Sequence, residues 1–397
     1  MNQINLKLTI GILLGNLFIA FLGIGLVIPV MPTIMNELGL SGSTVGYLVA
    51  AYAIAQMAGS PFAGKWVDSY GRKPMIMIGL FIFAFSEVLF GLGKSVEVLF
   101  VSRILGGFSA AFIMPAVTAF IADITSKSER AKALGYMSAA INTGFIIGPG
   151  IGGFLGDISI RLPFFAAAVF GAVAAIVSLF FLKEPPRQGA DKKIQTEKLS
   201  LKGGLRKILH PLYAAAFALI LIFSFGLASF ESLFSLFVDH KFGLTPKDIA
   251  IVVTAGGLLG ALAQLLLFDR LTKRMGEIAL TRYCLAVSVL LTLATTAANS
   301  YLEIMVISCI LFIGFDLIRP ALTTYLSKIA GDEQGFVGGM NSMFTSLGNI
   351  FGPIVGGALF DINLNYPFYF SAVILILGFM IAVFWRPGVN GEIQSAG

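Results

Sequence analysis

Long apolar runs alternate with short polar breaks along most of the chain. The runs cover about 8–30, 45–63, 75–92, 98–122, 133–156 and 162–182 and, after a longer polar stretch, about 211–238, 249–268, 278–297, 303–326, 335–360 and 367–386. Each is close to the roughly 20 residues that an α-helix needs to cross a bilayer, and far longer than the roughly ten residues of a membrane β-strand. Because backbone amides inside lipid must find partners within their own helix or a closed barrel, the pattern predicts an all-α membrane protein with twelve transmembrane helices.

The composition agrees with a chain embedded in lipid. Of the 397 residues, 57% are hydrophobic and 12% are charged, whereas roughly a quarter of the residues of a soluble domain are charged. The 45 glycines suit membrane helices, which approach closely where small residues meet. The first run is too long for the core of a signal peptide and another span follows it directly, so we expect it to be a membrane span.

Basic residues are distributed unevenly between alternate loops. One set of loops contains only Lys94, Arg161, Lys241 and Lys247, whereas most of the 27 lysines and arginines fall in the other set, on the side of both termini. Positively charged loops stay in the cytoplasm, so both termini are predicted to be cytoplasmic. The same rule accounts for the net charge of +6, and no nucleic-acid partner is expected.

No motif in the chain indicates catalysis, a metal or a cofactor. The two cysteines lie inside apolar runs and the two histidines, His210 and His240, lie at opposite membrane faces. A sequence similar to a phosphate-binding loop ends in Trp66, where a magnesium-binding Ser or Thr would be needed. A dinucleotide-like glycine pattern at 148–153 lies within an apolar run and follows no strand. We therefore expect a protein that is not an enzyme.

The chain divides into two similar parts. Residues 183–210 are polar and rich in Pro and Gly, which predicts a cytoplasmic linker between an N-terminal half, 1–182, and a C-terminal half, 211–397. The segment 115–118 is repeated at 320–323, and the glycine-rich segment 144–153 is repeated at 348–357. Such duplication is typical of transporters whose halves move about a central site.

Three motifs resemble those of one family. They are Gly64-Lys-Trp-Val-Asp68-Ser69-Tyr-Gly71-Arg72-Lys73 after the second run, Leu99-x-x-x-Arg103-x-x-Gly-Gly in the fourth, and Gly148-Pro149-x-Ile-Gly152-Gly153 in the fifth. The chain is identified from them as resembling the major facilitator superfamily, and within it the twelve-span drug/proton antiporters of Gram-positive bacteria. Segments 21–30, 229–233 and 314–320 are also similar to these exporters. Ser69 departs from the motif, which usually has a basic residue there.

The resemblance implies a major facilitator fold with two six-helix halves, in which one chain is the functional unit. It also implies proton-coupled efflux of amphipathic, often cationic compounds, such as dyes and fluoroquinolone-like drugs. The alternative is a proton-coupled transporter of one endogenous metabolite, and the fifth-span motif argues against uptake. The implied gating residues are Gly64, Asp68, Gly71, Arg72, Lys73, Asp123, Gly144, Gly148, Pro149, Gly152 and Gly153. The glycine-rich fifth and eleventh spans are expected where the halves meet.

Ionisable residues in the apolar runs are the candidates for proton coupling. A charge in mid-membrane costs about 3 kcal/mol or more, so such residues usually face water or a partner. Glu231 lies deep in the seventh run and Asp316 in the middle of the tenth. Surroundings poor in water favour a neutral carboxyl group, so both are candidates for reversible protonation, with Glu231 ranked first. Arg319 shares a helical face with Asp316, and the alternative is a fixed ion pair between them.

Three other charged residues carry further expectations. Arg103 is expected to act on a carboxylate in proton coupling, or else to bond backbone carbonyls between helices. Glu87, near the end of the third run, is expected to reach water along its flexible stem. Asp123 is expected near Arg72, either as a latch that favours an outward-open state or as a solvated surface pair.

The resemblance also implies a broad, weakly specific pocket. Its candidate lining residues are Tyr52, Gln56, Tyr136, Asn142, Phe145, Glu231, Ser235, Phe312, Phe315, Asp316, Asn341 and Asn349. The amides are expected to avoid lipid, because an unpaired polar group there is costly. Phe315 has packing between helices as its alternative. Drug and proton would compete for the same carboxylates, since protonation removes the charge that attracts a cation.

Overall fold

The computed structural model describes residues 3–185 and 210–385, and these ranges contain twelve long helices. The first six are α1 (Gln3–Val27), α3 (Gly42–Tyr70), α4 (Arg72–Leu92), α5 (Val96–Ile124), α6 (Lys127–Ile158) and α7 (Leu162–Phe181). The second six are α9 (Pro211–Phe242), α10 (Pro246–Met275), α11 (Glu277–Ala297), α12 (Tyr301–Ile329), α13 (Gln334–Ile362) and α14 (Tyr366–Phe384). A 3₁₀ turn (Ile28–Val30) and short α2 (Met31–Leu38) follow α1, and a second 3₁₀ turn (Gly331–Glu333) precedes α13. The predicted all-α fold is confirmed, whereas most of the predicted linker lies outside the described residues.

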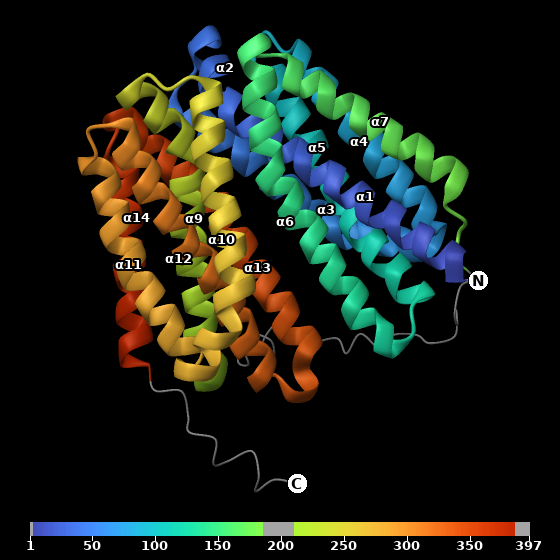
Figure 1. The fold of residues 1–397 in the computed structure, drawn as a ribbon. Helices are drawn as coiled ribbons and strands as arrows, with labels where there is room; N and C mark the ends of the chain where they lie inside the picture. Colours follow the sequence, from blue (N-terminus) through green and yellow to red (C-terminus); the bar gives the residue numbers. More distant parts are fainter. Residues whose placement is uncertain (1–2, 186–209, 386–397) are drawn as a thin grey trace, which may run out of the picture.

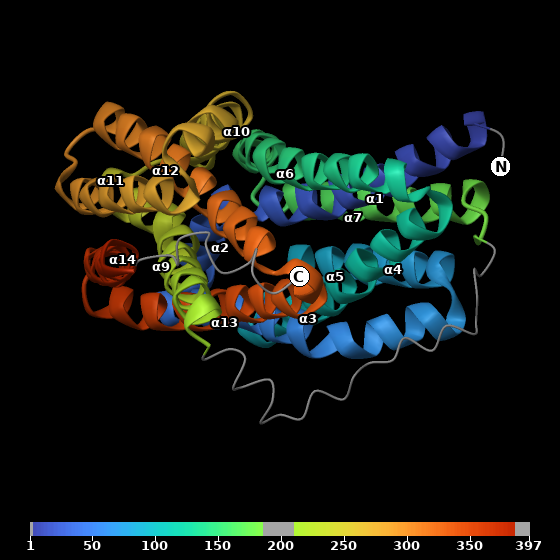
Figure 2. The same cartoon turned by 90° about the horizontal axis from the view of Figure 1, so that it is seen from below.

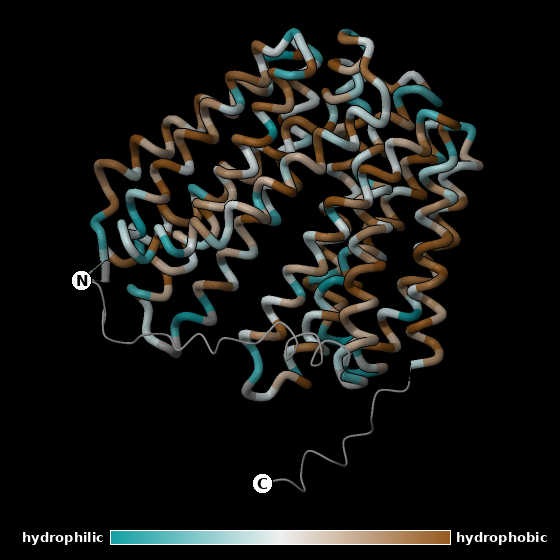
Figure 3. The backbone as a smooth tube through the Cα atoms, turned by 180° about the vertical axis from the view of Figure 1, so that it is seen from behind, coloured by the Kyte–Doolittle hydropathy of each residue, from teal (hydrophilic) through white to brown (hydrophobic). Residues whose placement is uncertain are grey.

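Most of the long helices are apolar enough to cross a membrane. Eleven spans qualify by length and composition among the described residues, and α3 does not. This helix carries Gln56, Lys65 and Asp68 as well as several glycines and serines. It nevertheless packs within the bundle against α5 and α13. Hydrophilic residues, teal in Figure 3, gather mainly where helices end.

The helices form two groups that meet at one end of the molecule. Helices α1 to α7 make up one group and α9 to α14 the other, and they contact each other along α3–α13 and α6–α10. Figure 1 shows the groups touching near α2 and diverging towards the end that carries the N-terminus. We call these the closed end and the open end. Viewed from the open end, α9 lies beside α2 and α13 (Figure 2).

An apolar cluster and polar contacts join the two groups at the closed end. Met35 and Val45 of the first group pack with Leu233 and Leu236 of the second. The closed-end latch, as we call it, is the carboxylate of Asp361, which accepts hydrogen bonds from the first-turn amides of α3. The amide of Gly42 lies 2.6 Å from one carboxylate oxygen and that of Ser43 2.9 Å from the other. The Ser43 hydroxyl also donates to Asp361.

A further hydrogen bond crosses the closed end, to a second acceptor. The side-chain amide (Nδ2) of Asn36, in α2, donates to the carboxylate of Asp239, near the end of α9, at 3.0 Å. Here too the first group supplies the donor and the second the acceptor.

The glycine-rich repeat has two faces, which corrects part of the sequence prediction. On α6, methyl groups added to Gly144, Gly148 and Gly152 would overlap the backbone of α1, in the same group. A methyl group on Gly153 would instead overlap Pro246 and Ala250 of α10, across the interface. On α13, Gly348, Gly352 and Gly356 face α9, whereas Gly357 faces Gly42 of α3. The halves therefore meet along α6 and α13 as predicted, but most of the motif packs within its own half.

The first turns of α3 and α10 differ, although they lie at equivalent positions of the repeat. Gly42 begins α3, and Pro246, 204 residues later, begins α10. Proline has no amide hydrogen to donate, and α10 is capped by its own Thr245 and Asp248, which bond each other reciprocally. Asp157, the repeat equivalent of Asp361, is exposed, and its carboxylate has no hydrogen bond among the described residues. Among the described residues, the latch therefore exists on one side of the closed end only.

Candidate transport site

Two carboxyl groups and a guanidinium group, carried by α9 and α12, lie near enough to interact electrostatically. Glu231 is exposed although it lies well inside a 32-residue apolar helix. Asp316 is half-buried and Arg319 is exposed. The positive charge of Arg319 interacts electrostatically with both carboxyl groups, and the negative charge of Asp316 interacts with Glu231. Within the described ranges no ion pair of 4.0 Å or less joins Arg319 to either carboxylate, so the fixed pair is not formed here.

Most of the predicted lining residues are accessible at least in part. Tyr136, Asn142 and Phe145 of α6 are exposed, and the half-buried ones are Tyr52, Gln56, Phe312, Asn341 and Asn349. Lys132 lies over the Tyr136 ring, 5.8 Å from its centroid. Ser235 is 4% exposed and Phe315 is 2% exposed. The Phe315 ring contacts those of Phe223 and Phe230, so it packs between helices, the alternative that the sequence left open.

A buried ion pair connects α4 and α5. A guanidinium nitrogen of Arg103 lies 3.6 Å from a carboxylate oxygen of Glu87, and the two side chains are 10% and 4% exposed. The guanidinium group also lies over the ring of Phe90, 4.3 Å from its centroid. The other carboxylate oxygen and the Arg103 Nε atom are buried without a hydrogen-bond partner. The expectation that Glu87 reaches water is therefore wrong, because its side chain is buried and pairs with Arg103 inside the bundle.

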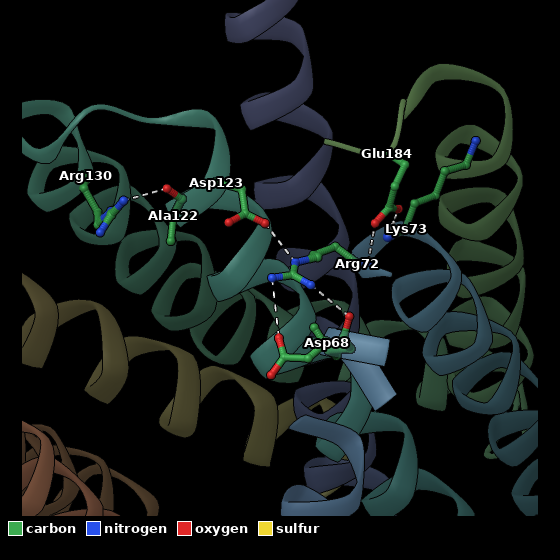
Figure 4. Close-up of polar contacts among 8 residues, drawn as sticks. Asp68, Arg72, Lys73, Ala122, Asp123, Arg130 and Glu184 are labelled. Atoms are coloured by element: carbon green, nitrogen blue, oxygen red, sulfur yellow. Dashed lines mark hydrogen bonds and ion pairs between the residues drawn. The ribbon is translucent and has the colours of Figure 1, made fainter. Parts of the chain in front are cut away.

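The motif between α3 and α4 forms a polar network at the open end (Figure 4). Arg72 Nε donates to Asp123 at 2.8 Å, and a second nitrogen of Arg72 lies 3.4 Å from Asp68. Glu184 accepts hydrogen bonds from the first amides of α4, those of Arg72 at 2.7 Å and Lys73 at 2.8 Å. The predicted Arg72–Asp123 contact is therefore present. It lies within one half while the open ends are apart, so it does not require an outward-open state.

Gly71 lies beside this network, and a separate capping box begins α6. Gly71 has a φ of +110°, a conformation that favours glycine, and a methyl group there would meet the Glu184 carboxylate. Gly64 has open space around it. At the start of α6, Ser126 and Glu129 form a capping box. The hydrogen bond from the Ser126 hydroxyl lowers the pKa of Glu129, so this cap is complete at neutral pH and weakens in acid.

The site can now be compared with known proteins. A family model described as Major Facilitator Superfamily matches residues 13–330 and 221–396. The chain belongs to the major facilitator superfamily. It is 62% identical to Multidrug resistance protein 1 of Bacillus subtilis (strain 168), over 96% of this chain and 97% of that protein. It is 45% identical to Quinolone resistance protein NorA of Staphylococcus aureus (strain Mu50 / ATCC 700699), over 94% and 95% of the two chains.

Solved structures share the superfamily fold at low identity. A bacterial homologue of the human lysosomal transporter Spinster, in an inward-facing and unoccupied conformation, superposes with a TM-score of 0.80 at 18% identity over 98% of this chain and all of the other. The nucleoside transporter NupG gives a TM-score of 0.80 at 16% identity, over 97% and 100% of the chains. Membership of this superfamily makes the chain a multi-pass membrane protein of a transporter family.

Sequence reasoning missed three contacts that join separate segments of the chain. These are the pair Glu87–Arg103, the cap of α4 by Glu184 and the cap of α3 by Asp361. A polar residue in or beside an apolar run was the available signal for Glu87, and the repeat of Asp157 at Asp361 was the signal for the latch. Neither signal names the partner, because the partner lies on another helix.

Proposed function

We propose that the chain is a proton-coupled multidrug exporter that works by alternating access. The observation that carries this proposal is the group of Glu231, Asp316 and Arg319, because it holds two carboxyl groups within apolar helices without a fixed ion pair. The names of the two relatives, a multidrug and a quinolone resistance protein, support amphipathic drugs as the substrate class. Both groups of helices belong to one chain, which supports a monomer as the functional unit.

The open end and both termini are inferred to face the cytoplasm. The basis is the concentration of lysine and arginine in the loops at that end. In this orientation a drug enters the site from the cytoplasm, and opening of the closed end exposes the same site to the outside. The exposed aromatic and amide side chains of α6 support a wide lining that accepts many shapes.

Exchange follows from competition at the carboxylates. A cationic drug is attracted by ionised Glu231 or Asp316, and a proton bound there removes the attraction. Drug binding therefore releases protons, and proton binding releases the drug, because the two ligands are linked reciprocally.

The decisive experiment measures proton release from purified protein in detergent when tetraphenylphosphonium is added. We expect release from the parent, less release from Glu231→Gln and Asp316→Asn, and an affinity at least about tenfold weaker for Glu231→Gln, as the loss of one charged contact predicts. In everted vesicles, dye uptake should follow an imposed pH gradient without ATP. Parent-like proton release from both variants would show that other residues carry the proton.

A further inference from the structure

Two glycines of α10 face two candidate site residues of α12. A methyl group on Gly260 would overlap the Oδ2 atom of Asp316 and would lie 2.9 Å from its Cγ atom. One turn earlier, a methyl group on Gly256 would overlap the ring of Phe312. Contacts this short force one of the two atoms to move. The Asp316 carboxyl group therefore occupies the space that any larger residue at position 260 would need.

The spacing on the two helices matches. Gly256 and Gly260 are four residues apart, as are Phe312 and Asp316, so each pair lies on one face of its helix. Both helices begin at the closed end and run side by side. The face of α12 that carries Asp316 is thus directed at the glycine face of α10. The Phe312 ring packs against Gly256, and the Asp316 carboxyl group packs against Gly260.

The charged groups around Asp316 explain why the orientation of its carboxyl group matters. Arg319 lies one turn away on the same helix and acts on Asp316, yet the two form no ion pair of 4.0 Å or less within the described ranges. Glu231 of α9 is the other charged group that interacts with Asp316. The charged residues of α10 lie near its ends, α11 presents the Ser288 hydroxyl to Gly314, and α13 has no charged residue between Gln334 and Phe360.

We infer that Gly260 is a positioning residue for proton exchange. It leaves room for the Asp316 carboxyl group against the backbone of α10, and so keeps that group from closing onto Arg319. An opposite charge in direct contact would hold the carboxyl group ionised and make it a poor proton acceptor. The inference rests on the proposed function and adds to it a residue that touches neither drug nor proton.

The test is the pH dependence of proton release on addition of tetraphenylphosphonium, measured for Gly260→Ala in detergent. The added methyl group turns the carboxyl group towards Arg319, so the pH of half-maximal release should fall by about one unit or more, the effect of a new ion pair. In Gly260→Ala/Arg319→Gln the midpoint should return towards that of the parent. Gly256→Ala is the matched control, because it displaces Phe312 instead and should leave the midpoint unchanged.

Each outcome decides between the alternatives. A parent-like midpoint for Gly260→Ala, or an equal shift for Gly256→Ala, would overturn the inference and leave the proposed function intact. The same shift in an Asp316→Asn background would also overturn it, since Asp316 would not be the group affected. Absence of proton release from the parent would overturn the proposed function and this inference with it. If Gly260→Ala does not fold, Arg319→Gln alone serves. Arg319 acts on Asp316 from a distance, so its loss should raise the midpoint by less than about one unit, whereas a rise of about one unit or more would mean that the two already form a direct ion pair and would overturn the inference.

Discussion

At the scale of single residues, the charged side chains within the bundle fall into two kinds. Glu231 and Arg319 are exposed and share no ion pair, whereas Glu87 and Arg103 are buried against each other. The sequence predicted that Glu231 and Asp316 matter, since an acidic residue inside an apolar run is conspicuous by itself. It could not predict the partner of Glu87, because a contact between two helices leaves no periodic trace along either.

The buried pair leads to a prediction about stability. Glu87→Gln leaves the Arg103 guanidinium group buried without a counter-charge, which should cost about 3 kcal/mol or more. Reversible unfolding in mixed detergent micelles measures this difference. The double variant Glu87→Leu/Arg103→Met removes both charges and should recover most of the loss. A single variant as stable as the parent would mean that water or another group satisfies Arg103.

At the scale of helices, the apolar runs located every long helix but not its ends. The run at 45–63 became α3, Gly42–Tyr70, because the helix continues through Lys65 and Asp68 to Gly71. Capping groups and glycines determine where a helix ends, and they lie beyond the last apolar residue of each run. The change from α1 to α2 at 28–30 also went unpredicted, although Pro29 and Pro32 lie there.

Gly152 and Gly135 lie on the same helix, α6, but only Gly152 packs against a neighbouring helix, so the two allow a controlled comparison by mutation. A methyl group on Gly152 would overlap the backbone of Leu26 in α1, whereas one on Gly135 meets nothing within 4 Å. Gly152→Ala should therefore destabilise the protein by about 1–3 kcal/mol. Gly135→Ala should be neutral or stabilise it by up to about 1 kcal/mol through helix propensity. Thermal unfolding of the two variants side by side tests this, and equal effects would contradict the close α1–α6 packing.

At the scale of the whole molecule, the sequence repeat predicted two halves, and the packing of α1 to α7 and of α9 to α14 agrees with such a division. It could not predict which end is closed. Both conformations of an alternating transporter use the same helices, and the choice between them depends on a few contacts such as Asp361 with Gly42. Contacts of this kind contribute about as much as single hydrogen bonds, which no pattern of hydrophobicity records.

The closed-end latch predicts a change in conformational equilibrium. Asp361→Ala removes the acceptor of two α3 amides, so the population with a separated closed end should rise by about fivefold or more, as the loss of a charged hydrogen bond of about 1–2 kcal/mol implies. Distances between spin labels at Lys94 and Asn299, in a chain without its two cysteines, report this population. Asp157→Ala is the control, because Asp157 has no such bond, and it should leave the distances unchanged. Identical distributions for both variants would show that the latch does not hold this end.

The proline at the start of α10 makes the two interhelix contacts of the closed end, α3–α13 and α6–α10, chemically unequal. The Asp361 carboxylate bonds across the contact between α3 and α13. The contact between α6 and α10, in contrast, consists of glycine packing and of the Lys247 ammonium group over the Phe154 ring, 5.5 Å from its centroid. We expect the halves to separate first at the α6–α10 contact and to rotate about the α3–α13 contact. The order in which the repeated contacts separate would then follow from the bonds that Asp361 makes and Asp157 does not.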